Sequence, residues 1–350
     1  MKNTKFFLYG LVFLLLLSSC SKIFYVHIRV MEPSPIFVPP HIKKVVVINR
    51  TYTPETKQNK AVNILEGALS QEIPFQDRIA AEECVRGLAD QLNQLPRFQA
   101  QLDTRYKLEG TGTKIFPSPL DWGKIKEICN YYQCDGVISL EMFDSDNIHE
   151  INPVRRETTV NGQKQYYTEY VAHLGIKVEA GWRIYDPESR QIIDQNNFID
   201  TRAWDGSGKN QLEAIAKCPP QVEMVKQGGY AAGMQYAYRI SPNWVTVTRE
   251  MYKRGNEAFK RAYRLCNTGQ WNEAAEACKP YINDPDPKIA GRACHNIAVV
   301  AEVNGNLDAA IDWVRKAYVD YGLKRSRDYY NQLMQRKRAE EVLRQQMESK

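Results

Sequence analysis

Residues Tyr166–Ile184, with the sequence YYTEYVAHLGIKVEAGWRI, decide the fold of the larger part of this chain. The even-numbered positions are apolar or small except for Thr168, and the odd-numbered positions are mostly polar. Successive side chains of a strand point to opposite faces, so this alternation predicts a long antiparallel strand with one covered face. The covered face would consist of Tyr166, Tyr170, Ala172, Leu174, Ile176, Val178, Ala180, Trp182 and Ile184.

The segments around this strand extend it into a sheet. Asn161-Gly162 is a strong type I′ turn signal after Val154–Val160, which predicts a hairpin. After a turn at residues 186–190, the segment Gln191–Thr201 would add another strand. Upstream, the β-branched runs His41–Arg50 and Asp135–Phe143 are typical of buried strands.

Helices are predicted between these strands. Apolar residues recur at helical spacing between Ala81 and Leu95, and Pro96 ends the pattern, so this helix would cover one face of the sheet. A second helix spans 121–133 with Asp121 as its N-cap, and a third lies near 219–238. A last strand near Trp244–Thr248 completes a mixed, partly antiparallel α/β sheet domain over residues 41–250. The fold class is therefore α+β, because residues 251–350 are predicted to be all-α.

An internal repeat marks this second part. Gly269–Ala275 (GQWNEAA) recurs as Gly305–Ile311 (GNLDAAI), at an offset of 36 residues. Small residues stand where paired helices must approach closely, and glycine suits the turn between them. The repeat resembles the tetratricopeptide family over residues 252–320, although it lacks the family's early tryptophan and its leucine-glycine pair. Ser326–Met347 would form a capping helix after these tetratricopeptide-like helical repeats.

Stacked helical pairs leave a concave face, formed mainly by the first helix of each pair. Counting from Ala262 and Ala298, which must face a partner helix, predicts which residues line it. An alternative is that Phe259 packs against the first domain or the capping helix. The predicted partner-binding residues are Asn256, Phe259, Tyr263, Arg292, His295, Val299 and Glu302.

The N-terminus has the three parts of an export signal. Lys2 and Lys5 precede the apolar run Phe6–Leu17, and Ser18-Ser19-Cys20 follows it. Its twelve apolar residues fall short of the ~20 that span a bilayer as a helix. We therefore expect a lipoprotein signal peptide at residues 1–19 and lipid on Cys20, the alternative being an ordinary secretory signal.

Residues 20–40 contain Pro33, Pro35, Pro39 and Pro40 and are expected to form an extended, Pro-rich tether. The residues after Cys20, Ser21–Phe24, are basic and apolar rather than acidic. Acidic residues at this place would resemble surface-exported lipoproteins. We therefore expect an outer-membrane lipoprotein on the periplasmic face.

Charge and cysteine usage narrow the function classes. The net charge of +6 falls to +4 without Lys2 and Lys5 (6 − 2), which argues against nucleic acid as a partner. Seven cysteines remain after Cys20 in a compartment that permits disulfides. Most are expected to be small buried packing residues, with a Cys129–Cys134 bridge as an alternative and a zinc site disfavoured.

The first domain also carries a family resemblance. Strand His41–Arg50, a helix ending at Leu95–Phe98 and the strand Cys134–Leu140 follow in an order that resembles the α/β domain of the TolB amino-terminal region and the curli-secretion lipoprotein. The whole layout resembles a family of Bacteroidota lipoproteins of uncharacterised function. That resemblance implies no enzymatic activity.

Together these features predict a non-catalytic envelope lipoprotein with no cofactor and no metal. It would bind membrane lipid through acylated Cys20 and another envelope protein through its helical repeats, as a scaffold or adaptor. The alternative is a subunit of an oligomeric outer-membrane secretion or envelope-assembly complex, which includes a homo-oligomer. A third class is an enzyme or glycan binder that uses exposed aromatic residues.

Overall fold

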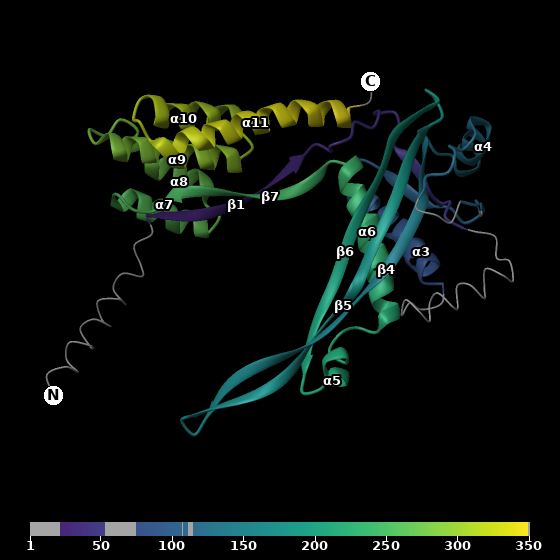
Figure 1. Ribbon diagram of the computed structural model, residues 1–350. Helices are drawn as coiled ribbons and strands as arrows, with labels where there is room; N and C mark the ends of the chain where they lie inside the picture. The colour runs from purple at the N-terminus through teal and green to yellow at the C-terminus, as the bar shows by residue number, and fades with distance from the viewer. Residues whose placement is uncertain (1–21, 53–74, 107, 111–114, 349–350) are drawn as a thin grey trace. The chain divides into compact units, whose positions relative to one another are not determined.

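The computed structural model describes residues 22–52, 75–106, 108–110 and 115–348 (Figure 1). The predicted signal peptide and Cys20 lie outside the described residues. The chain divides into two compact units. Pro33–Asn243 with Leu343–Lys350 form the sheet unit, and Met1–Glu32 with Trp244–Val342 form the helical unit. None of the helices in the described ranges is both long enough and apolar enough to cross a membrane.

The sheet unit is built on five strands in the order β3-β2-β4-β5-β6. Strand β2 runs parallel to both β3 and β4, and β4, β5 and β6 are antiparallel, so the predicted mixed sheet is confirmed. Strands β4 and β5 meet at the predicted Asn161-Gly162 turn, where both residues have positive φ (52° and 77°). The bounds are β2 Lys44–Asn49, β3 Gln99–Leu102, β4 Gly136–Val160, β5 Gln163–Asp186 and β6 Gln191–Gly208.

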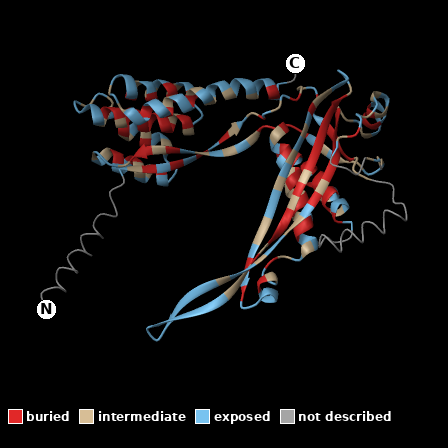
Figure 2. Ribbon diagram, viewed as in Figure 1, coloured by how far each residue is buried: buried red, intermediate tan, exposed pale blue. Residues whose placement is uncertain are grey.

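Helices cover both faces of this sheet. On one face α3 (Gln76–Gln94) and α6 (Gln221–Ile240) share an apolar core with the sheet. On the other face α4 (Trp122–Tyr132) packs against β2 and β4, and the predicted cap is confirmed because the Asp121 side chain accepts from the Gly123 amide at 2.7 Å. The short helix α5 (Gln211–Ile215) follows β6. Buried residues accordingly concentrate in the helix-covered part of the strands (Figure 2).

Helices α3 and α6 are in very close contact because glycine lies at their crossing. A Cβ built on Gly233 would stand 1.8 Å from the Cys84 carbonyl oxygen, and one on Gly87 would stand 2.1 Å from that of Tyr230. No other residue type fits such a seam without moving the helices apart.

The covered face of β5 is shorter than predicted. Its even-numbered residues are buried from Ala172 to Ile184, as expected, but Tyr166 is 54% exposed. The reason is that β6 ends at Gly208, which pairs with Tyr170. Beyond that pair the β4–β5 hairpin is two-stranded and exposed on both faces, as its pale-blue end shows (Figure 2).

The helical unit contains two helical hairpins and a long final helix. The first hairpin is α7 (Glu257–Asn267) with α8 (Trp271–Cys278), and the second is α9 (Pro287–Val303) with α10 (Leu307–Val319). A 3-10 turn, η1 (Lys279–Tyr281), follows α8. Gly269 and Gly305 have φ of 74° and 76° at the two turns, which confirms their predicted places. The predicted capping helix is α11 (Lys324–Met347).

The expected tether is wrong in its main part. Residues 20–40 contain strand β1 (Ile23–Glu32), which pairs with β7 (Asn243–Tyr252) in a two-stranded sheet. Strand β7 therefore does not complete the large sheet, contrary to expectation. Alternate β1 residues, from Phe24 to Val30, are buried in the same apolar core as the helices. A solvated tether would leave these apolar side chains in water, whereas their burial in the core is favourable.

Candidate functional site

The predicted concave face is not open to solvent. Phe259 and Val299 have no exposed surface, and His295 and Glu302 are 2% and 1% exposed. Phe259 and Val299 belong to the same apolar cluster as Phe24 of β1 and Met251 of β7. The predicted exposure of these four residues is wrong, because the β1–β7 sheet occupies the place where a partner was expected.

The other three predicted residues also have internal roles. Asn256 caps α7, its side chain accepting from the Phe259 amide at 3.0 Å. Tyr263 is half-buried, with its ring 4.8 Å from that of Phe24 in an edge-on contact. The Arg292 guanidinium lies 5.2 Å from the ring centroid of Tyr252. Of the seven predicted residues, four are therefore buried inside the helical unit and the other three are half-buried in it.

Glu302 of α9 is the centre of a buried charge network. Arg249 of β7 donates to both carboxylate oxygens, at 2.8 and 3.0 Å. From α11, the Tyr329 hydroxyl donates at 2.6 Å and Arg336 at 2.7 Å. The network therefore joins a strand and two helices through one carboxylate.

Electrostatics keep this carboxylate ionised. Burial by itself raises the pKa of Glu302, but hydrogen bonds from Arg249, Tyr329 and Arg336 outweigh it, so the pKa is lowered. Burial and the charge of Glu302 raise the pKa of the Tyr329 hydroxyl well above its usual range. Removing one partner of such a buried pair would leave the remaining charge buried and unpaired, which is strongly destabilising.

Both ring nitrogens of His295 also have hydrogen-bond partners. Its Nε2 lies 2.9 Å from the carbonyl oxygen of Glu250, which can only accept, so Nε2 carries the proton. Its Nδ1 then accepts from the Ser326 hydroxyl at 2.9 Å. Burial lowers the pKa of His295 to about 4, so the imidazole is neutral near pH 7.

The sheet unit has a matching buried carboxylate, Glu141 of β4. Arg50 donates to it at 2.9 Å and the Tyr185 hydroxyl at 2.7 Å, while Arg183 lies 3.7 Å away. Burial is the main cause that raises the pKa of Tyr185 to about 12, and the negative charge of Glu141 adds to it. Arg50 and Arg183 also donate to the carbonyls of Ser118 and Pro117, so this cluster holds the segment before α4 against the sheet.

The cysteines after Cys20 are free thiols. Cys129 and Cys134 do not form the bridge considered as an alternative. All are buried except Cys134, which is half-buried, so the predicted packing role is confirmed. The set is Cys84, Cys129, Cys134, Cys218, Cys266, Cys278 and Cys294.

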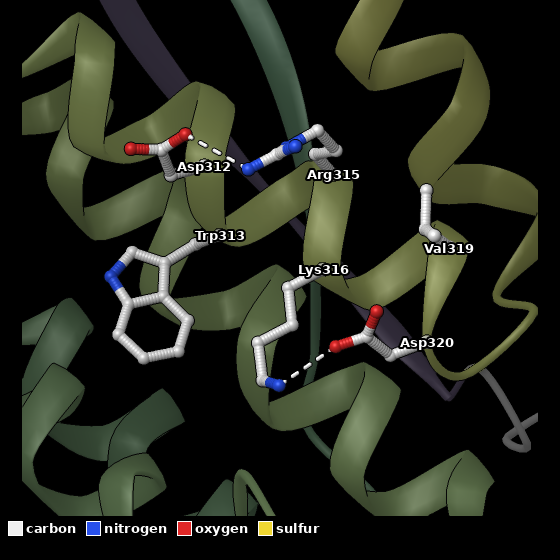
Figure 3. A pocket seen from close by; sticks show the side chains of 6 residues that line it. All are labelled: Asp312, Trp313, Arg315, Lys316, Val319 and Asp320. Carbon is white, nitrogen blue, oxygen red and sulfur yellow. Dashed lines mark hydrogen bonds and ion pairs between the residues drawn. The ribbon is translucent and has the colours of Figure 1, made fainter.

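The outer surface of α10 offers a different candidate for binding. A depression of about 370 Å³ is lined by residues of this helix and by its C-cap residue, and we call this surface the α10 face (Figure 3). Lys316 pairs with Asp320 at 2.8 Å and Arg315 with Asp312 at 3.7 Å. Val319 is 69% exposed. The α10 face consists of Asp312, Trp313, Arg315, Lys316, Val319 and Asp320.

Sequence reasoning missed this surface and strand β1. The signal for β1 was present, because residues 24–30 (FYVHIRV) alternate between apolar and polar side chains. The prolines that follow this segment favour a tether instead, which is why the strand was not predicted. The α10 face has no comparable signal, since periodicity does not show which residues of a helix surface border a depression.

Comparison with family models identifies two matches. Residues 42–252 match a domain of unknown function (DUF8603), and residues 260–337 match another (DUF6340). The chain belongs to the DUF8603 family. The DUF8603 match extends from just before β2 to the end of β7, and the DUF6340 match lies within the span of α7 to α11. No curated protein matches the chain.

Three solved structures are similar to part of this DUF8603 chain. A PelC dodecamer from Paraburkholderia phytofirmans is 13% identical and covers 61% of this chain and 98% of its own, with a TM-score of 0.19. A putative neuraminyllactose-binding hemagglutinin homolog from Helicobacter pylori is 11% identical, with coverages of 58% and 88% and a TM-score of 0.23. A minor lipoprotein from Acinetobacter baumannii is 10% identical, with coverages of 58% and 98% and a TM-score of 0.20. These TM-scores are too low to carry an argument.

Proposed function

We propose that this chain is an outer-membrane lipoprotein, anchored by lipid on Cys20, that acts as a non-catalytic scaffold for another envelope protein. The observation that carries the anchor is the leader: basic residues, the apolar run Phe6–Leu17, and two serines before Cys20. Several acyl chains on one residue hold a protein durably at a membrane. The basic and apolar stretch Ser21–Phe24 supports the periplasmic face.

The non-catalytic part of the proposal is supported by the state of the buried charges. Glu141 and Glu302 are each paired with arginine and tyrosine, and His295 uses both ring nitrogens. A general acid or base needs a position from which it can exchange a proton with substrate. These groups lack such a position because their partners occupy it.

The scaffold's binding surface is proposed to be the α10 face rather than the filled concave side. Trp313 is half-buried and therefore held in place, and Figure 3 shows Trp313 and Lys316 extending to the same side of the helix. Tryptophan and arginine are the residues that most often dominate binding energy at protein interfaces. Val319 adds exposed apolar surface, and the surrounding charges of both signs would form a polar rim.

The anchor is tested with the variant Cys20→Ala. In cells, Cys20→Ala should release the protein from the membrane fraction, and mass spectrometry of the wild type should find lipid on an N-terminal Cys20. A wild-type protein that starts elsewhere or carries no lipid would refute the anchor. Protease treatment of intact cells should leave the protein whole, whereas digestion would place it on the cell surface.

For the scaffold, we expect Val319→Asp to lose the envelope proteins that co-purify with wild type. The matched control is Val222→Asp on α6, where the valine is 42% exposed. This control should keep those proteins, and both variants should unfold at the wild-type urea concentration. Full retention of every co-purifying protein by Val319→Asp would exclude the α10 face.

One observation favours the oligomeric alternative. The end of the β4–β5 hairpin exposes Tyr166, Tyr167 and Val160 at 54%, 49% and 43%. An isolated two-stranded hairpin is marginally stable in water, so this end would gain from pairing in a complex. Light scattering of the purified protein separates the alternatives, because a mass of one chain would exclude a homo-oligomer.

A further inference from the structure

A cavity of about 540 Å³ lies in the sheet unit. It is formed by β4, β5 and the connection from α5 to α6. Its volume falls within the range of about 300–1,000 Å³ that is usual for small-molecule sites. The neighbouring side chains form an apolar cluster of their own, separate from the cores on the two faces of the sheet.

The interior of this cavity is apolar. Leu174, Cys218 and Met224 are 6%, 9% and 6% exposed, and Ile148 and Pro219 are half-buried. The Cys218 thiol is directed to the Trp204 carbonyl oxygen at 3.5 Å, which holds it in the wall. Among the described residues that line the cavity there is no aspartate, glutamate, lysine or arginine, so a charged group buried here would find no counter-ion among them.

The kind of apolar group follows from the lining. The described part of the lining consists of aliphatic, sulfur-containing and proline side chains with a few uncharged polar ones and His149, and within it there is no phenylalanine, tyrosine or tryptophan. Aromatic ligands are usually held by stacking on aromatic rings, whereas flexible aliphatic chains need only apolar contact area. His149 is among the exposed members of the lining and therefore belongs to the rim.

We propose that this cavity binds one unbranched hydrocarbon chain of a lipid, with the polar end of that lipid outside the rim. This activity is independent of the scaffold function, because it uses the sheet unit and not the α10 face. This hydrocarbon chain belongs either to a free fatty acid or to a membrane phospholipid, since both offer the apolar chain that the cavity recognises.

The test uses Cys218 as a reporter in the full chain carrying Cys20→Ala, so that detergent is not needed. Saturated fatty acids from eight to eighteen carbons are the probes, and N-ethylmaleimide modification of Cys218 is followed by mass spectrometry of its peptide. Each methylene that enters the cavity should strengthen protection by roughly fourfold. Protection should stop increasing once the chain fills the cavity. Cys266, a buried thiol of the helical unit, is the internal control and should react at an unchanged rate.

A pair of variants makes the result specific to the cavity. Ile148→Asp places a carboxylate in the wall and should abolish protection of Cys218. Ile199→Asp, at a position on β6 that is 58% exposed and outside the lining, should leave protection unchanged. Circular dichroism should show that both variants fold.

The outcomes decide the proposal. Protection by fatty acids supports a free fatty acid as the source, and protection by phosphatidylethanolamine vesicles alone supports a phospholipid chain. Absence of protection by either probe, equal protection of Cys266, or protection that does not depend on chain length would each overturn the proposal. Stronger protection by naphthalene than by any fatty acid would overturn it as well.

Discussion

Replacing Glu302 by glutamine should destabilise the helical unit strongly. The carboxylate accepts four hydrogen bonds, two from Arg249, one from Tyr329 and one from Arg336. Glutamine has nearly the same shape but no charge, so Arg249, which is 8% exposed, would remain a buried cation without a counter-ion. Removing one partner of a buried pair typically costs about 3–5 kcal/mol of unfolding free energy.

The assay is urea unfolding followed by far-ultraviolet circular dichroism, with the unfolding free energy extrapolated to water. The control is Glu340→Gln, which removes a half-exposed carboxylate 3.4 Å from the Arg336 Nε. Glu340 is 46% exposed, so this i,i+4 helix pair should contribute less than about 0.5 kcal/mol. A loss of under ~1 kcal/mol for Glu302→Gln would refute the structural role of the network.

The folded pKa of His295 is about 4, below its unfolded value of 6.5, so the unfolded state binds the proton first as the pH falls. Acidification from pH 6.5 to 4 should therefore remove up to ~3 kcal/mol of stability, and a His295→Gln variant should show a flatter dependence in urea titrations at stepped pH. Phe24→Ala should lower the unfolding free energy of the helical unit by about 3–5 kcal/mol, because it truncates a buried aromatic side chain. Tyr25→Ala, at an exposed position, should cost little. Equal melting temperatures of the two variants would mean that β1 is a tether. Gly233→Ala should lower the urea midpoint of the sheet unit by the equivalent of about 1–3 kcal/mol, because its methyl group would overlap the Cys84 carbonyl; an unchanged midpoint would show that α3 and α6 can separate freely.

The interpretation of local elements from sequence was largely correct. The alternation in β5, the Asn161-Gly162 turn, the Asp121 cap and the glycine turns at Gly269 and Gly305 are all present. Each depends on residues within a few positions of one another. Their geometry follows from backbone sterics and neighbouring hydrogen bonds, which are the same wherever the segment lies in the fold.

The partner of each apolar face was not predictable in the same way. Tyr166 continues the apolar alternation of β5, yet it is exposed because β6 ends at Gly208. Phe259 lies on the predicted face of its helix, yet that face is filled by β1, more than 200 residues earlier in the chain. Periodicity identifies a face that should be covered but carries no information on what covers it.

The sequence by itself therefore determined most of the strands, turns and helices of this protein and its α+β class. Only the tertiary structure decided that four of the residues expected to bind a partner, Phe259, His295, Val299 and Glu302, are buried inside the helical unit. The physical reason is that apolar burial has no direction and no sequence range, so any apolar strand of the right length can cover a given helix face. Which strand does so depends on chain connectivity and on paired groups such as Arg249 and Glu302, which meet only in the folded state.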